Sequence, residues 1–75
     1  MTLEKLAKWN EDMAVYAEAI GRKDCTKNSL ASAAACREAQ RGRIVRQSPV
    51  LCHSRVLFLH DNAIAETDRL LKECK

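Results

Sequence analysis

Aromatic side chains are scarce in this sequence: its 75 residues include one tryptophan, one tyrosine and one phenylalanine. Apolar residues make up an ordinary 47% of the chain, but alanine supplies much of that share, so a thin core is expected. A chain of this length buries only about 60% of the surface that its unfolded state exposes. We predict one domain over residues 1–75, whose core is marginal without a covalent staple or a partner.

Long apolar runs are also missing. No stretch approaches the roughly 20 residues that span a bilayer, which excludes a transmembrane helix. The first four residues lead directly into a helical pattern, so no targeting segment is expected at this end. Earlier removal of a signal peptide stays open.

Motifs for catalysis are absent as well. The carboxylates are scattered along the predicted solvated sides of helices, and no glycine-rich phosphate loop is present. No serine, cysteine or histidine lies in a recognisable nucleophile context. A core this small also leaves little room for a pocket of about 300 Å³ or more. We expect that the protein is not an enzyme and needs no cofactor.

Helical periodicity dominates what is present. From Thr2 to about Ile20, apolar residues recur at spacings of three and four, and Gly21 follows as a left-handed cap. Asn10 falls inside this apolar stripe, where a polar residue commonly fixes the register of a packed seam. These features predict a first helix.

A second helix is predicted from Asn28 or Ser29 to Arg41, after a polar connection over residues 22–28 and before Gly42 as a cap. The small residues of its alanine-rich tract share one side, so another helix can approach closely there. The alternative is a continuous helix to Arg46, with Gly42 inside it at a cost of about 1 kcal/mol.

The strongest pattern covers Ser48 to Cys74. Ser48 suits an N-cap and Pro49 the first helical position. Heptad spacing then links Val50, Leu57, Ile64 and Leu71, with His53, His60, Thr67 and Cys74 between them. We predict that this third helix is the hub of the fold and lies in the groove between the other two.

Three helices with short connections favour an all-α fold, a small antiparallel three-helix bundle running up, down and up. The alternative is a disulfide-stapled helical hairpin with a loosely attached N-terminal helix.

Four cysteines in so short a chain indicate disulfides. If the second and third helices are antiparallel, Cys36 and Cys52 lie nearly level beside their shared turn. Cys25 and Cys74 would then pair at the far end. The fit is poorer there, because about 33 Å of helix separates Cys52 from Cys74, whereas about 25 Å separates Cys36 from Cys25. This nested pattern is our prediction, and buried reduced thiols are the alternative.

The cysteine count and the helical setting resemble the mitochondrial twin-cysteine hairpin proteins. That family spaces its cysteines alike on both helices, whereas here ten residues separate Cys25 from Cys36 and twenty-one separate Cys52 from Cys74. We therefore do not assign the chain to it. Paired cysteines would indicate an oxidising compartment (periplasm, the secreted space or the mitochondrial intermembrane space), and reduced thiols the cytoplasm.

Two histidines, His53 and His60, lie a heptad apart near Cys52, and these three residues together with Cys36 are the candidate metal ligands. Their spacings match no zinc signature such as Cys-x-x-Cys, and helical neighbours such as Cys52 and His53 point about 100° apart. A histidine at the edge of an apolar stripe is more often packed with one ring nitrogen hydrogen-bonded. We expect no metal site.

Positive charge gathers in residues 37–55, although the net charge is only +3. This arginine cluster comprises Arg37, Arg41, Arg43, Arg46 and Arg55, with Glu38 as the one acidic residue among them. It is expected to be a solvated basic turn or a contact for an acidic protein surface or phosphates. Nucleic-acid binding is the alternative function. A helix-turn-helix, however, would need polar base-reading residues where the predicted third helix opens with apolar ones.

Leu51, Phe58 and Ala65 lie in a line at heptad spacing on the otherwise polar side of the predicted third helix. Such a strip indicates burial by a partner protein or a second copy. Because the core is marginal and catalytic motifs are absent, we predict a small helical interaction module: a subunit, adaptor, inhibitor or assembly factor. Its partner-binding surface would comprise the strip and the arginine cluster.

Overall fold

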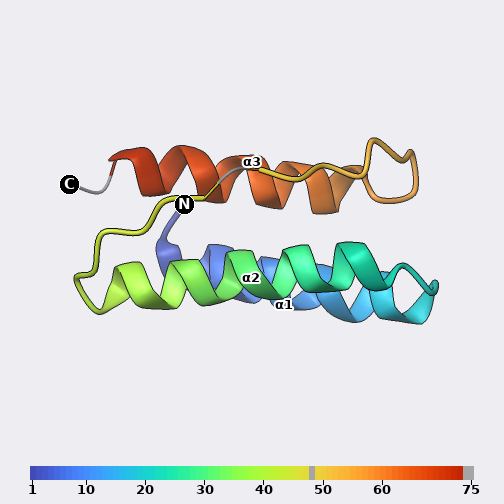
Figure 1. Cartoon of the computed structure of the whole chain (residues 1–75), viewed down its shortest axis with the longest axis horizontal. Coiled ribbons are helices and arrows are strands. Elements are labelled where there is room, and N and C mark those ends of the chain that lie inside the picture. The colour runs from blue at the N-terminus through green and yellow to red at the C-terminus, as the bar shows by residue number, and fades with distance from the viewer. Residues whose placement is uncertain (48, 74–75) are drawn as a thin grey trace.

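The computed structural model describes residues 1–47 and 49–73, which form three helices (Figure 1). They are α1 (Leu3–Ala19), α2 (Lys23–Gln40) and α3 (Phe58–Glu73), and no strand occurs in the described ranges. The predicted all-α three-helix bundle is confirmed. Ser48 and Cys74, which the sequence places at the ends of the third helix, lie outside the described residues.

The first helix matches its prediction. The Thr2 hydroxyl accepts a hydrogen bond from the backbone N–H of Lys5 at 3.2 Å and so caps α1. Gly21 follows with φ +79°, a left-handed conformation that costs glycine little. Because this turn is so tight, α2 begins at Lys23 and not near Asn28 as predicted. It ends at Gln40 before Gly42, whose φ is +85°, so the alternative of a helix continuing to Arg46 is wrong.

The prediction for the third helix is wrong over its first part, because α3 begins at Phe58. Tertiary and local bonds hold the preceding segment out of helical conformation. The Asp61 carboxylate accepts the backbone N–H groups of Cys52 and His53 at 2.6 and 2.8 Å, and His53 has φ +52°. The Ser54 hydroxyl accepts the N–H of Val56 at 3.2 Å, which closes a local turn.

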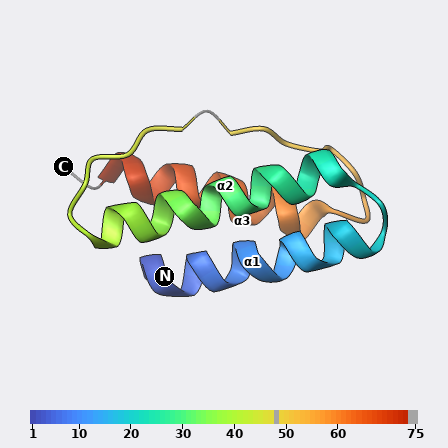
Figure 2. The ribbon, with the colours of Figure 1, turned by 60° about the horizontal axis from the view of Figure 1, so that its bottom comes forward.

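The helices do not run up, down and up. α1 is antiparallel to both α2 and α3, whereas α2 and α3 run in the same direction (Figures 1 and 2). His60 near the start of α3 contacts Cys25 near the start of α2, and Thr67 contacts Cys36 further along both helices. Parallel helices need a crossing connection, and residues 41–47 and 49–57 run back along the bundle to provide it.

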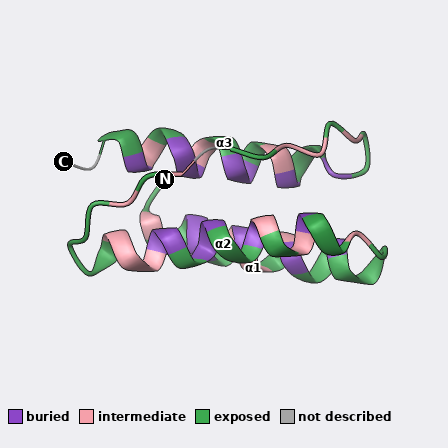
Figure 3. Cartoon of the chain, viewed as in Figure 1, coloured by how far each residue is buried: buried purple, intermediate pink, exposed green. Residues whose placement is uncertain are grey.

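The core lies where the three helices face one another (Figure 3). From the heptad stripe that the sequence predicts over residues 50–71, Leu57, Ile64 and Leu71 are buried, whereas Val50 is 55% exposed. The fully buried Asn10 donates from Nδ2 to the Leu6 carbonyl at 2.9 Å and to the Thr67 hydroxyl at 2.8 Å. This polar contact fixes the register of α1 on α3, the structural role expected for Asn10.

Candidate functional site

A disulfide joins Cys25 in the first turns of α2 to Cys52 in the segment before α3, with the two Cα atoms 6.8 Å apart. The predicted pairs, Cys36 with Cys52 and Cys25 with Cys74, are therefore wrong. They assumed that α2 and α3 are antiparallel, whereas the crossing segment carries Cys52 back to the start of α2. Cys36 is buried deeper in the bundle, with its sulfur 3.9 Å from the Thr67 hydroxyl.

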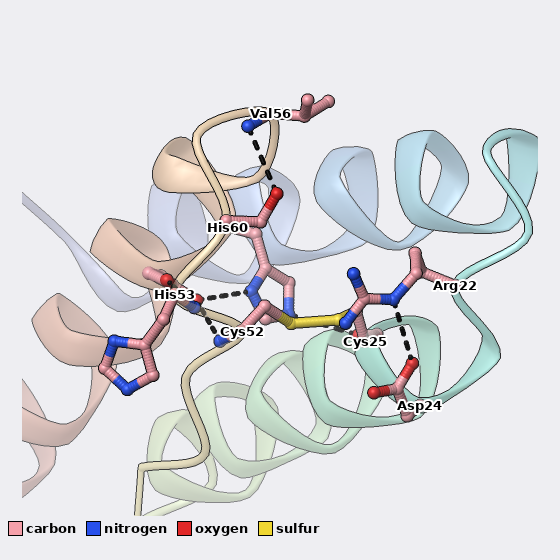
Figure 4. Close-up of polar contacts among 9 residues, drawn as sticks. Arg22, Asp24, Cys25, Cys52, His53, Val56 and His60 are labelled. Atoms are coloured by element: carbon pink, nitrogen blue, oxygen red, sulfur yellow. Dashed lines mark hydrogen bonds and ion pairs between the residues drawn. A yellow bond between two sulfur atoms is a disulfide. The ribbon is translucent and has the colours of Figure 1, made fainter.

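The side chain of His60 lies beside this disulfide and is fully buried (Figure 4). Its Nδ1 is 3.1 Å from the Asp61 carboxylate, and its Nε2 is 3.2 Å from the carbonyl oxygen of Cys25. Both neighbours are acceptors, and a neutral imidazole has only one N–H. A neutral ring therefore donates to only one of these two oxygens, and the tautomer decides which one.

Asp61 organises this end of the bundle. Burial raises the pKa of its carboxyl group, but the N–H of Cys52, the ring of His60 and the N–H of His53 together outweigh burial and lower the pKa below its usual value. The carboxylate thereby ties the segment before α3 to the first turn of that helix.

The structure brings three potential metal-ligating side chains together, and they come from two distant parts of the chain. Ligand atoms of Cys25, Cys52 and His60 all lie within 4.8 Å of one another. The sequence indicated Cys52 and His60 but missed Cys25, since only the path of the crossing segment places it there. The other candidates lie elsewhere: His53 is exposed, and Cys36 is in the middle of the bundle.

An apolar groove opens beside this cluster, between α1 and the start of α3. Its volume is about 310 Å³. Its lining consists of Met13, Tyr16, Val56, Phe58 and Leu59. Directly next to it in sequence, Leu57 is buried against Ala17 and Cys25, with Cys52 packed beside them. The groove and the disulfide therefore share one structural support.

The predicted strip of Leu51, Phe58 and Ala65 is not continuous. Leu51 lies outside α3 and is half-buried, whereas Phe58 and Ala65 are exposed on the helix. Of the three, only Phe58 lines the groove. The sequence could identify Phe58 as an exposed aromatic residue, but the other lining residues come from α1 and from a segment that was expected to be helical.

The arginine cluster is spread over the molecule, whose longest dimension is 35 Å. Arg41 and Arg43 follow the C-terminal end of α2, whereas Arg55 comes three residues after Cys52, which the disulfide joins to the start of that helix. Ion pairs join Arg37 to Glu11 at 2.7 Å, and Arg41 and Arg43 to Glu38 at 2.6 and 2.9 Å. Arg46 and Arg55 are exposed. The structure does not bring the five arginines together as one patch.

Comparisons with protein-family models, curated proteins and solved structures give no match. Within the described part of the chain, no helix is both long enough and apolar enough to cross a membrane. Any functional assignment therefore depends on the site itself.

Proposed function

We propose that this protein is a helical interaction module, and that the groove beside the disulfide binds the apolar side of a helix in a partner protein. The observation that carries the proposal is the exposure of large apolar side chains around one hollow. Phe58 and Val56 are each 57% exposed, Leu59 is 44% exposed and Tyr16 is 41% exposed. Contiguous exposed apolar surface of this kind is typical of protein interaction sites.

A helix is the occupant that this groove favours. Its walls are α1 and the start of the antiparallel α3, extended by Val56 from the preceding segment, so a partner helix laid along them would pack as a further member of the bundle. The wall formed by Val56 and Phe58 is held in place by the disulfide and by Asp61. A preordered wall loses little conformational entropy on binding, which favours affinity.

The arginine cluster supports the alternative, nucleic-acid binding, less well. Three of its five members are engaged by carboxylates, which reduces the positive field available to phosphates. We expect no measurable binding of duplex DNA in a titration at about 50 mM salt. Binding that weakens steeply with added salt would favour the alternative.

Substitution of Phe58 tests the proposal. A photo-reactive side chain at position 58 should cross-link, in an extract of the source cells, to residues on the apolar side of a partner helix. The matched control is Leu30 on α2, which is 51% exposed and lies away from the groove. When the partner is purified, the Phe58→Asp variant should no longer bind it, whereas the Leu30→Asp variant should bind it as the wild-type protein does.

Three outcomes would overturn the proposal: equal cross-linking from positions 58 and 30, cross-links that map to a polar segment, or equal loss of binding in both aspartate variants. Size-exclusion chromatography with light scattering adds a further check. A stable homodimer that only Phe58→Asp dissociates would make a second copy the occupant in place of a different protein.

A further inference from the structure

We propose that reduction of the Cys25–Cys52 disulfide converts this end of the bundle into a binding site for Zn²⁺ or a similar thiophilic divalent ion. Cys25, Cys52 and His60 would be the ligands, and Asp61 would orient His60. This inference does not depend on the groove or its partner.

The positions of the three side chains favour zinc. In a tetrahedral site with zinc–sulfur distances of about 2.3 Å and zinc–nitrogen distances of about 2.0 Å, ligand atoms are roughly 3.5–3.8 Å apart. The ligand atoms of Cys25, Cys52 and His60 already lie within 4.8 Å of one another. The Cα atoms of the two cysteines are 6.8 Å apart, so side-chain rotation alone can separate the sulfurs to the distance that the metal needs.

His60 is already placed as a metal-binding histidine commonly is. Such a residue usually donates its second ring N–H to a carboxylate or carbonyl oxygen, which fixes the orientation of the ring. Here Nδ1 lies 3.1 Å from Asp61, and Nε2 lies on the side of Cys25, 3.2 Å from its carbonyl oxygen. Figure 4 shows the ring against the sulfur–sulfur bond.

The surroundings are also suitable. Cys25, His60 and the neighbouring Leu57 are at most 1% exposed, so bulk water competes little for the ligands. Three protein ligands leave the fourth position of a tetrahedral ion to water or to an outside donor.

The chemistry balances with a dithiol as reductant. The dithiol transfers two electrons to the disulfide and becomes a cyclic disulfide itself, and its two protons end on the sulfurs of Cys25 and Cys52. Zn²⁺ then displaces both thiol protons to solvent and binds Nε2 of His60 in the neutral tautomer that carries its proton on Nδ1, toward Asp61. Either state, oxidised or metal-bound, ties the segment before α3 to α2.

Matched double variants test the assignment of the thiols. Cys36→Ser/Cys74→Ser keeps the proposed pair, and Cys25→Ser/Cys52→Ser removes it, so each retains two thiols. After anaerobic reduction and removal of the dithiol, the first variant should bind one Co²⁺ per chain with thiolate-to-cobalt charge-transfer absorption. In its oxidised form it should bind none.

The second double variant should show no such absorption. Circular dichroism should record the helix content of this variant, which shows whether packing alone keeps it folded. A direct measurement on the first variant covers the case in which the second fails to fold: Zn²⁺ should protect both Cys25 and Cys52 from alkylation. Equal cobalt binding by both variants, or no protection of either thiol, would overturn the proposal.

Single substitutions test the histidine and its orienting carboxylate. In the Cys36→Ser/Cys74→Ser background, Asp61→Asn should weaken Zn²⁺ binding about 10- to 100-fold, the range for residues that position a ligand. His60→Gln should weaken it further and change the cobalt spectrum. The controls are Glu66→Gln on α3 and His53→Gln in the preceding segment, both expected to bind normally. Unchanged affinity in both Asp61→Asn and His60→Gln would overturn the assignment of His60.

Discussion

At the scale of single residues, Asp61 constrains this fold more than its position in the sequence suggests. Its carboxylate accepts hydrogen bonds from two backbone N–H groups and contacts the buried ring of His60. These bonds outweigh the effect of burial, so the folded state holds the pKa of Asp61 below its usual value.

The direction of that pKa shift predicts a pH dependence of stability. A carboxyl group whose pKa is lower in the folded state stabilises the fold fully above its unfolded pKa of about 3.9, and this contribution is lost as pH falls through the lower, folded pKa. The melting temperature of the oxidised protein should therefore decrease as the pH is lowered below about 4. Asp61→Asn should lower the free energy of unfolding by about 2 kcal/mol at pH 7, and it should weaken the dependence of stability on pH in the acid range.

Thermal melts followed by circular dichroism at several pH values measure both effects. Glu66→Gln is the control, because Glu66 pairs with Arg69 on the exposed side of α3. An acid slope identical in the wild-type protein and Asp61→Asn would contradict the role assigned to this carboxylate.

Asn10 supports a second prediction at this scale. Its Nδ2 bonds two oxygens in the core, so Asn10→Ala leaves the Thr67 hydroxyl without this donor and opens a cavity. We expect a loss of about 2–3 kcal/mol in the free energy of unfolding. Urea denaturation checks it, with the exposed Asn62→Ala as a control that should change stability by less than about 0.5 kcal/mol. Equal effects of the two substitutions would be the contrary result.

At the scale of elements, the segment before α3 gives the clearest prediction. Because residues 50–57 are not helical, their amide hydrogens should exchange rapidly, except where a specific acceptor protects them. The amides of Cys52 and His53 should exchange slowly because Asp61 accepts both, and the amides of Ser54 and Arg55 should exchange fast. Amide exchange measured by NMR distinguishes these cases. Uniform slow exchange over residues 50–57 would indicate the continuous helix that the heptad pattern predicts.

The same segment shows what sequence reasoning could and could not reach. The end of α1 at Gly21 and the buried heptad positions Leu57, Ile64 and Leu71 follow from local sequence patterns, and the structure confirms them. Val50 continues that heptad but is exposed. Periodicity cannot reveal that the Asp61 carboxylate and a distant cysteine hold the preceding residues in another conformation.

The disulfide end shows a similar division. Cys52, His60 and Phe58 could be singled out from the sequence, because cysteines, heptad histidines and exposed aromatics carry recognisable signals. Cys25 and Tyr16 could not be linked to them. Their proximity depends on the parallel course of α2 and α3, and helix direction follows from the path of the crossing segment rather than from any local pattern.

At the scale of the whole molecule, the disulfide closes a loop between residues 27 positions apart. By the chain-entropy estimate, a loop of that size stabilises the fold by about 3.5 kcal/mol. For a small domain this is a large part of the total stability. Reduction should therefore lower the melting temperature markedly, and the Cys25→Ser/Cys52→Ser variant should match the reduced protein. A melting temperature that reduction leaves unchanged would contradict this estimate.

The groove and the two arginines that follow α2 are also separated at this scale. The apolar groove lies beside the disulfide, near the start of α2, whereas Arg41 and Arg43 follow the C-terminal end of that helix. A single compact partner helix in the groove would not reach both. We therefore expect that replacing Arg41 and Arg43 by serine leaves binding at the groove intact.

Peptide mapping of the oxidised protein tests the central claim most directly, because both the groove and the proposed metal site depend on the pairing of Cys25 with Cys52. Trypsin should release the four cysteines on separate peptides, covering residues 24–27, 28–37, 47–55 and 73–75. Mass spectrometry without reductant should find peptide 24–27 linked to peptide 47–55. A link between 28–37 and 47–55, or between 24–27 and 73–75, would contradict the account.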